Sequence, residues 1–176
     1  MTGLSHAGVP LGPSIRAFRW TVVPGARPDT ADMSAFIDRL LRLWDEPIID
    51  WAAAETAFRS VYADPVTVND VKMPVSDLIR RAVALQETYE GRTTEVVECM
   101  ETPGRIALAI RIRGRHVGAL ATPLGPVTPT GRMVEIRVID LLTLSGGLVT
   151  SMWTASDELG LLRQLDAIAL ASPGPA

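Results

Sequence analysis

Cysteine and histidine are scarce in this 176-residue sequence. Cys99 is the only cysteine, so a single chain can form neither a disulfide framework nor a four-cysteine zinc site. The two histidines are His6 and His116. His6 lies in a terminal segment rich in glycine and proline, so we expect no metal site built from several histidines.

An excess of one charge and long apolar runs are missing as well. The 17 Lys and Arg against 20 Asp and Glu leave a net charge of −3, without the basic excess typical of nucleic-acid binding. No apolar run approaches the roughly 18 residues of a membrane span. The N-terminus lacks the basic and then apolar pattern of a signal peptide. We therefore expect a soluble, cytoplasmic protein without nucleic-acid or membrane partners.

The hydrophobic content of 47% is sufficient for the core of one domain. Residues 1–28 are rich in Gly, Pro and Ser and have Phe18 and Trp20 as their only large anchors. We predict a flexible N-terminal extension there, which can also dock on the domain or on a partner subunit. The domain is predicted over 29–170, followed by a loose tail over 171–176.

The first half of the domain has helical spacing. Apolar residues recur every three or four positions from Met33 to Trp44, and Pro47 ends this pattern. Ser76 is a suitable N-cap for a later helix, and Gly91 is a suitable stop. We predict helices over 30–44, 50–62, 76–91 and 156–169.

The second half alternates between apolar and polar residues. Strands are predicted over 93–101, 105–118, 133–144 and 148–155, and the segment 66–71 is predicted to be extended. The short connections at 102–104 and 145–147 allow only antiparallel neighbours. Helices followed by such strands predict an α+β fold, in which the N-terminal helices cover the concave face of a curved, cone-shaped antiparallel sheet. Such a cone encloses a pocket.

Two ionisable side chains fall on the apolar faces of neighbouring strands. His116 continues the face formed by Ile106, Leu108, Ile110 and Ile112, and Asp140 shares a face with Ile136, Val138 and Leu142. Burying such groups is unfavourable unless they are paired or used. We predict that Asp140 and His116 face one pocket as general acid and base. Structural roles stay open, because a buried aspartate can bind amides and a histidine can anchor a loop.

Other side chains are candidates for binding a substrate beside this pair. Thr154 and Met152 share a strand face, Val138 neighbours Asp140, and Asn69 follows an extended segment. Trp44 and Tyr62 offer aromatic surface, with core packing as the alternative. The candidates are Thr154, Asn69, Met152, Val138, Trp44 and Tyr62. The sequence contains no GxSxG elbow, phosphate-binding glycine loop or HExxH motif.

Four stretches resemble a known family: GRHVG at 114–118, PTGR at 129–132, VEIRVID at 134–140 and DELGLLRQL at 157–165. Over residues 31–170 the chain resembles the SnoaL-like polyketide cyclases of the nuclear transport factor two-like superfamily. The resemblance implies an enzyme that needs no cofactor, and a dimer packed through the outer sheet face. The acid/base aspartate of the aldol cyclases corresponds to Thr154 here, and a histidine of their pocket corresponds to Asp140. Asp140 would then be the acidic group, with altered chemistry or an altered substrate.

We therefore predict a cofactor-independent cyclase or isomerase that acts on a hydrophobic polyketide-type intermediate and forms a homodimer. Two alternatives stay open. Hydrolysis or opening of an epoxide would need a second inward carboxylate beside Asp140. A non-catalytic, ligand-binding dimeric domain would instead use the face of Ile139 and Leu141 as its interface.

Overall fold

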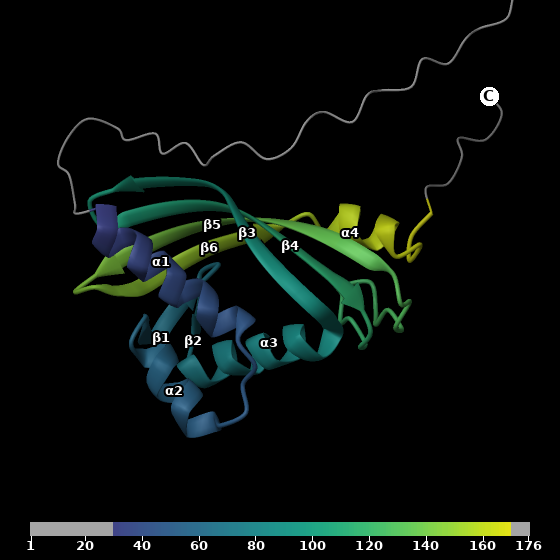
Figure 1. Ribbon diagram of the computed structural model, residues 1–176, viewed down its shortest axis with the longest axis horizontal. Coiled ribbons are helices and arrows are strands. Elements are labelled where there is room, and N and C mark those ends of the chain that lie inside the picture. Colours follow the sequence, from purple (N-terminus) through teal and green to yellow (C-terminus); the bar gives the residue numbers. More distant parts are fainter. Residues whose placement is uncertain (1–29, 170–176) are drawn as a thin grey trace, which may run out of the picture.

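The computed structural model describes residues 30–169, so the extension predicted over 1–28 and the tail over 171–176 lie outside the described residues. The described chain begins with two helices, a short hairpin and a third helix, and continues with four long strands and a last helix (Figure 1). The elements are α1 (Thr30–Asp45), α2 (Trp51–Arg59), β1 (Tyr62–Val68), β2 (Val71–Met73), α3 (Val75–Thr88), β3 (Tyr89–Thr102), β4 (Arg105–His116), β5 (Met133–Ser145), β6 (Leu148–Ser156) and α4 (Glu158–Gln164).

The strands form one curved sheet in the order β2-β1-β6-β5-β4-β3. β3 pairs antiparallel with β4, and β5 with β6, as their short connections predicted. β4 and β5 also pair antiparallel, although a long loop joins them. β1 pairs in parallel with β6, so the whole sheet is mixed rather than purely antiparallel. The short turns do not constrain this pair, because α3 and the four strands β2, β3, β4 and β5 separate β1 from β6 along the chain. The α+β class with a curved sheet is confirmed.

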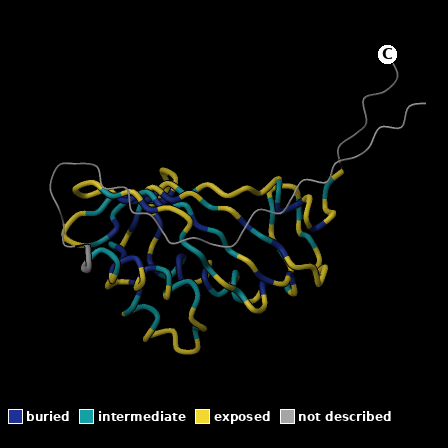
Figure 2. Tube along the Cα trace, turned by 45° about the horizontal axis from the view of Figure 1, so that its top comes forward, coloured by how far each residue is buried: buried dark blue, intermediate teal, exposed yellow. Residues whose placement is uncertain are grey.

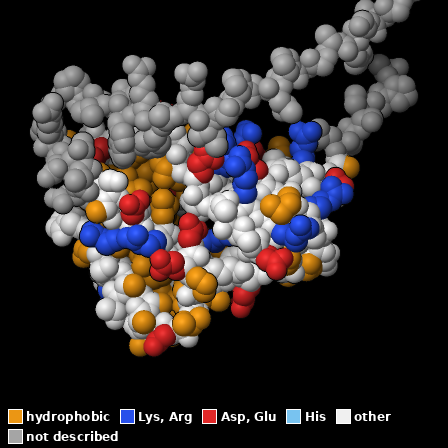
Figure 3. Space-filling view, viewed as in Figure 1, with side chains coloured by type: hydrophobic (Ala, Val, Ile, Leu, Met, Phe, Trp, Pro, Cys, Tyr) orange, Lys and Arg blue, Asp and Glu red, His pale blue; other side chains and the backbone are white. Residues whose placement is uncertain are grey.

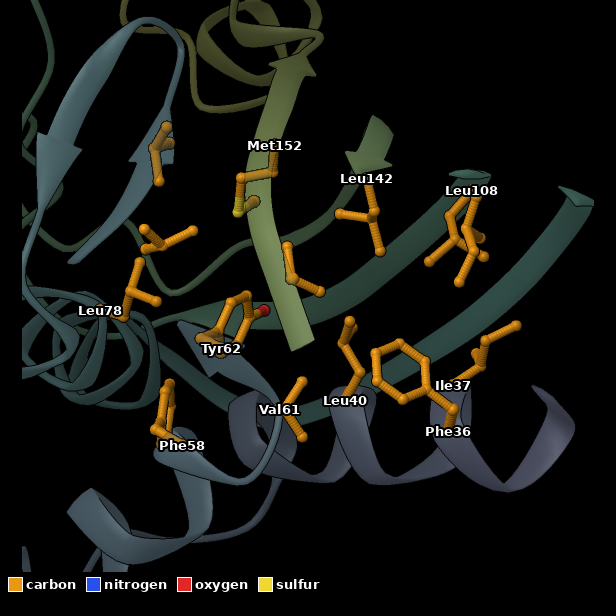
Figure 4. Packing of buried hydrophobic residues seen from close by; sticks show 14 of the residues in the cluster. Phe36, Ile37, Leu40, Phe58, Val61, Tyr62, Leu78, Leu108, Leu142 and Met152 are labelled. Carbon is orange, nitrogen blue, oxygen red and sulfur yellow. The ribbon is translucent and has the colours of Figure 1, made fainter. Parts of the chain in front are cut away.

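The N-terminal helices cover one face of the sheet and close the main core against it (Figure 1). Their apolar residues meet inward residues of the strands, and Figure 4 shows Phe36, Ile37 and Leu40 of α1 directed toward Leu108, Leu142 and Met152. Burying each large apolar side chain contributes about 1.5–3 kcal/mol, so this cluster is the main stabilising contact of the fold. Along the strands, buried and exposed residues alternate (Figure 2).

A smaller core lies at the other end of the sheet. It joins Leu161 of α4 and Leu165, the residue that follows α4, to Tyr89, Val134 and Ile136 of the strands. No helix in the described chain is long and apolar enough to cross a membrane.

Several helix ends differ from the sequence prediction. α2 ends at Arg59 rather than 62, because Tyr62 begins β1 and pairs with β6. α3 begins at Val75, because the Asp64 carboxylate of β1 accepts the Val75 N–H at 3.0 Å in place of a cap by Ser76. α3 ends at Thr88, where the chain passes directly into β3 before reaching Gly91. α4 is shorter at both ends than the predicted 156–169: it begins at Glu158, after the Asp157 cap, and ends at Gln164.

Candidate functional site

Asp140 lies on β5 in the interior of the sheet, with its side chain on the helix-covered face. In the antiparallel ladders it is opposite Leu108 of β4 and Thr154 of β6. The residue is only 9% exposed, and its Oδ1 atom is buried without a hydrogen-bond partner among the residues described. Its burial follows the alternation read from the sequence, and an unpartnered carboxylate oxygen at such a place calls for a functional explanation.

The surroundings of Asp140 change its acidity. Burial raises the pKa of the Asp140 carboxyl above its ordinary value of 3.8, because the charged form loses hydration. The Thr154 side chain acts in the opposite direction through a hydrogen bond that favours the carboxylate. A carboxyl group with a raised pKa exchanges protons closer to neutral pH, which is the property required of a general acid or base.

Tyr62 and Trp44 form a hydrogen-bonded pair in the same core. The Trp44 indole N–H donates to the Tyr62 hydroxyl oxygen at 3.0 Å, and the Tyr62 ring stacks on Phe58 with 6.1 Å between centroids. Burial raises the pKa of Tyr62, the Trp44 bond lowers it, and the charge of Asp140 raises it further. Tyr62 is paired with Val149 of β6, the strand that also carries Thr154.

The direction of the Tyr62 hydroxyl supports this grouping. In Figure 4 the hydroxyl points inward, toward the strands that carry Met152 and Leu142. Trp44 uses the acceptor side of the oxygen, so the phenolic proton remains available to another acceptor. Met152 is buried opposite Leu142. Val138 is half-buried and packs against both cores.

Asn69 has a different place from the one expected. Its side-chain oxygen accepts the Thr154 N–H at 2.8 Å, and its side-chain nitrogen donates to the Thr154 carbonyl at 3.0 Å. The residue is exposed in the β1–β2 turn, with φ of 47°. Both ends of the carboxamide are thus engaged with the backbone of β6. Asn69 positions Thr154, and its carboxamide does not face the carboxylate as a substrate ligand.

His116 is wholly buried on the expected face of β4, but it lies far from Asp140. Leu108 is the residue opposite Asp140, and His116 is eight residues farther along the strand. At about 3.3 Å per residue, this separation is about 26 Å along β4. The structure does not bring the two groups into one hollow, which corrects the predicted acid/base pair. Face alternation gave the side of the sheet correctly but carried no information about distance along it.

The immediate partners of His116 are Tyr89 and Thr130. The rings of Tyr89 and His116 lie 5.9 Å apart on opposite residues of β3 and β4. His116 Nδ1 accepts the Thr130 N–H at 3.3 Å and lies 3.1 Å from the Thr130 hydroxyl. Burial lowers the pKa of His116, which favours the neutral ring. The imidazole therefore fastens the long loop over 117–132 to the end of β4.

Thr130 and Tyr89 were missed by sequence reasoning. Thr130 lies in a Pro- and Gly-rich loop whose return path the sequence does not specify. Tyr89 lay within a predicted helix, although it begins β3. The available signal was the segment 128–131, which contains a proline and a glycine and comes just before a strand. Such a composition is typical of a loop, here one that folds back on the preceding strand.

A groove of about 360 Å³ is present elsewhere, between α1 and α2. Its lining comes from residues 39–61 and includes neither Asp140 nor His116. Within the range 30–169, no group of three or more His, Cys, Asp or Glu side chains is arranged to hold a metal ion.

Comparison with known proteins gives one family and many structures. The model of the SnoaL-like polyketide cyclase family matches residues 36–165. Among curated proteins, none matches the chain. The solved structure of TsrD from Streptomyces laurentii is 19% identical, with a TM-score of 0.67, and the match covers 81% of this chain and 100% of that one.

Two further structures are similar at comparable levels. AclR from Streptomyces galilaeus, a candidate hydroxylase, is 18% identical with a TM-score of 0.62, covering 79% of this chain and 98% of its own. A SnoaL-like polyketide cyclase from Agrobacterium tumefaciens is 15% identical with a TM-score of 0.58, and the match covers 74% of this chain and 97% of that one. At these identities the structural likeness shows a shared fold.

Proposed function

The chain belongs to the SnoaL-like polyketide cyclase family, and on this premise we propose that it is a cofactor-independent cyclase or isomerase of a hydrophobic polyketide-type intermediate. Asp140 is the proposed acid/base residue. The observation that carries the proposal is its buried carboxylate on an apolar face, with one oxygen that has no partner among the described residues. Membership of the family supports an enzyme of this general kind.

The proposed step is a proton transfer at the Asp140 carboxylate. The ionised group removes a proton from a carbon next to a substrate carbonyl, and the carbonyl oxygen takes the negative charge as an enolate. The Tyr62 hydroxyl, whose proton is not used by Trp44, is the proposed donor to that oxygen. The protonated Asp140 then returns the proton to carbon in an isomerisation, or to the new alkoxide in a ring closure.

The apolar side chains around Asp140 contribute orientation. Met152, Leu108 and Leu142 offer hydrophobic surface next to the carboxylate. Holding a flexible substrate in a reactive conformation can lower a barrier by up to about 7–11 kcal/mol. Epoxide hydrolysis is less well supported, because Asp140 is the only buried carboxylate in residues 33–169 and two are usually needed to hold and activate water.

The test uses 2-tetralone, a hydrophobic ketone with exchangeable α-protons, in D2O. We expect the wild-type chain to accelerate deuterium exchange, as measured by proton NMR, and Asp140→Asn to reduce this acceleration at least ~100-fold. His116→Asn serves as the matched control and should retain the acceleration. An Asp140→Asn variant that is folded and still exchanges at the wild-type rate would remove Asp140 from this role.

We also infer a homodimer that forms through the outer face of the sheet. Ile139, Leu141 and Trp153 are each about half exposed, and Leu141 lies directly opposite Trp153 in the ladder. Val97 and Met100 of β3 add to the exposed apolar residues. Contiguous apolar surface of this kind is typical of an interface.

A further inference from the structure

The groove between α1 and α2 is separate from the Asp140 region. Its volume of about 360 Å³ is within the range of small-molecule sites. All of its lining residues precede β1, so no strand residue contributes to it. On α1 it uses Arg39, Arg42 and Leu43, whereas Phe36, Ile37 and Leu40 point to the sheet (Figure 4). The groove is therefore on another side of α1 from the core.

Apolar side chains, three of them alanines, make up much of the groove lining. Leu43 of α1 and Ala54 and Ala57 of α2 line it, together with the buried Phe58. Ile48, from the loop between the helices, is half-buried at one end. Alanines leave space between the two helices that a larger side chain would fill. This surface suits an alkyl chain or an aromatic ring.

Two guanidinium groups border this apolar surface. Arg39 and Arg42 lie one helical turn apart on α1, and neither forms an ion pair with a carboxylate in residues 33–169. Arg59 and Arg80 on the neighbouring helices, by contrast, are paired with Glu55 and Asp77. Figure 3 shows basic side chains across α1, with hydrophobic side chains below them toward α2.

Two acidic side chains also line the groove, at the end where α1 passes into α2. The Asp50 carboxylate accepts the N–H groups of Ala52 and Ala53, which caps α2. Glu46 lies at the C-terminal end of α1, one to two turns beyond the arginines, without an ion pair in the described part of the chain. The groove thus has two arginines on α1, two carboxylates at the connection between the helices, and apolar residues along the rest of its lining.

We propose that this groove binds an amphiphile with a carboxylate head group. The head group pairs with Arg39 and Arg42, which suit planar carboxylates through paired N–H donors, and the apolar part lies on Leu43, Ala54 and Ala57. This second site goes beyond the proposed catalytic function and does not depend on it, because Asp140 is not part of the lining.

The experiment is isothermal titration of the full chain with dodecanoate at low ionic strength, below the micelle concentration. We expect saturable binding at one site, weakened at least tenfold in R39Q/R42Q. The matched control is R81Q/R163Q, which removes two exposed arginines elsewhere and changes the net charge equally. That control should bind as the wild type does. Dodecanol, which lacks the carboxylate, should bind at least tenfold more weakly than dodecanoate.

A steric variant and a site control complete the test. Ala57→Phe fills the groove and should abolish binding, with its fold checked by circular dichroism. If Ala57→Phe does not fold, R39Q/R42Q decides alone. Asp140→Asn should bind dodecanoate normally. The proposal is overturned if the wild type does not bind, if R39Q/R42Q binds equally well, or if Asp140→Asn loses binding, since the ligand would then lie against the sheet.

Discussion

Thr154 lies directly opposite Asp140 across the β5–β6 ladder, and its own backbone N–H and carbonyl are both held by the Asn69 side chain. The turn after β1 thereby fixes the residue whose side chain favours ionised Asp140. Burial acts against ionisation. The charge state of Asp140 therefore depends on its burial on β5, on Thr154 of β6, and on the β1–β2 turn that holds Thr154.

Asp140→Asn should alter how stability depends on pH. Folded Asp140 has a raised pKa, so the folded state holds a proton that the unfolded state releases above 3.8. Wild-type stability therefore falls as pH rises from 3.8 through the folded pKa, and the asparagine variant lacks this loss. Within that window the variant should gain up to about 1.4 kcal/mol over the wild type for each pH unit. Urea unfolding between pH 3.5 and 7.5 checks this, and parallel curves would contradict it.

Tyr62→Phe should destabilise the fold by about 0.5–1.5 kcal/mol, because the Trp44 indole N–H loses its acceptor. Trp44→Phe removes the same bond from the other side. In a double-mutant cycle the two changes should therefore couple by about 1 kcal/mol. Trp51→Phe, on the exposed side of α2, is the control and should not couple with Tyr62→Phe. If the losses of unfolding free energy in Trp44→Phe and Tyr62→Phe simply add in the double variant, the hydrogen bond does not contribute as proposed.

His116→Asn should loosen the loop over 117–132. The imidazole accepts the Thr130 N–H, and the loop also joins the strand through Arg132 and Gly131 backbone bonds. We expect faster amide hydrogen exchange in that loop, measured by mass spectrometry, with less change around Asp140. Thr130→Val, which removes only the hydroxyl, should give a smaller effect. Equal exchange in the wild type and both variants would show that His116 does not hold the loop.

The same histidine predicts an acid sensitivity. Burial lowers the pKa of folded His116 below the ordinary value of 6.5, so the unfolded state binds a proton first as pH falls. The stabilising contribution is complete above 6.5 and is lost as pH falls from 6.5 through the folded pKa. His116→Asn should flatten the wild-type stability profile in that window, as followed by urea unfolding. An unchanged slope would exclude His116 as its source.

Leu141→Glu should convert the proposed dimer to a monomer. It places a charge at the centre of the apolar outer face, opposite Trp153, where pairing would bury it. Leu159→Glu is the matched control, since Leu159 is similarly exposed but lies on α4. Analytical ultracentrifugation should show a dimer for the wild type and Leu159→Glu only. A monomeric wild type, or a dimeric Leu141→Glu, would reject this interface.

Local patterns were sufficient for much of the fold. The three-to-four-residue spacing placed α1, and the short turns after β3 and β5 required antiparallel neighbours. Helix ends were less predictable because they depend on distant partners. The cap of α3 comes from Asp64 on β1, a contact that no pattern around Val75 reveals.

The candidate site shows the same division. Strand alternation predicted that Asp140 and His116 are both buried, and both are. It could not predict that Leu108 rather than His116 lies beside Asp140, nor that Asn69 is used by the backbone of Thr154. The parallel contact of β1 with β6, which brings Tyr62 into this core, also joins segments far apart in the chain.

The sequence by itself determined which side chains turn inward, because the geometry of a helix or a strand repeats every few residues. Only the tertiary structure decided which of those side chains meet. Whether two side chains come into contact depends on the register between strands and on which distant segments pair. Neither produces a repeating pattern in the sequence. Asp140 therefore lies opposite Thr154, and His116 holds a loop at the other end of the sheet.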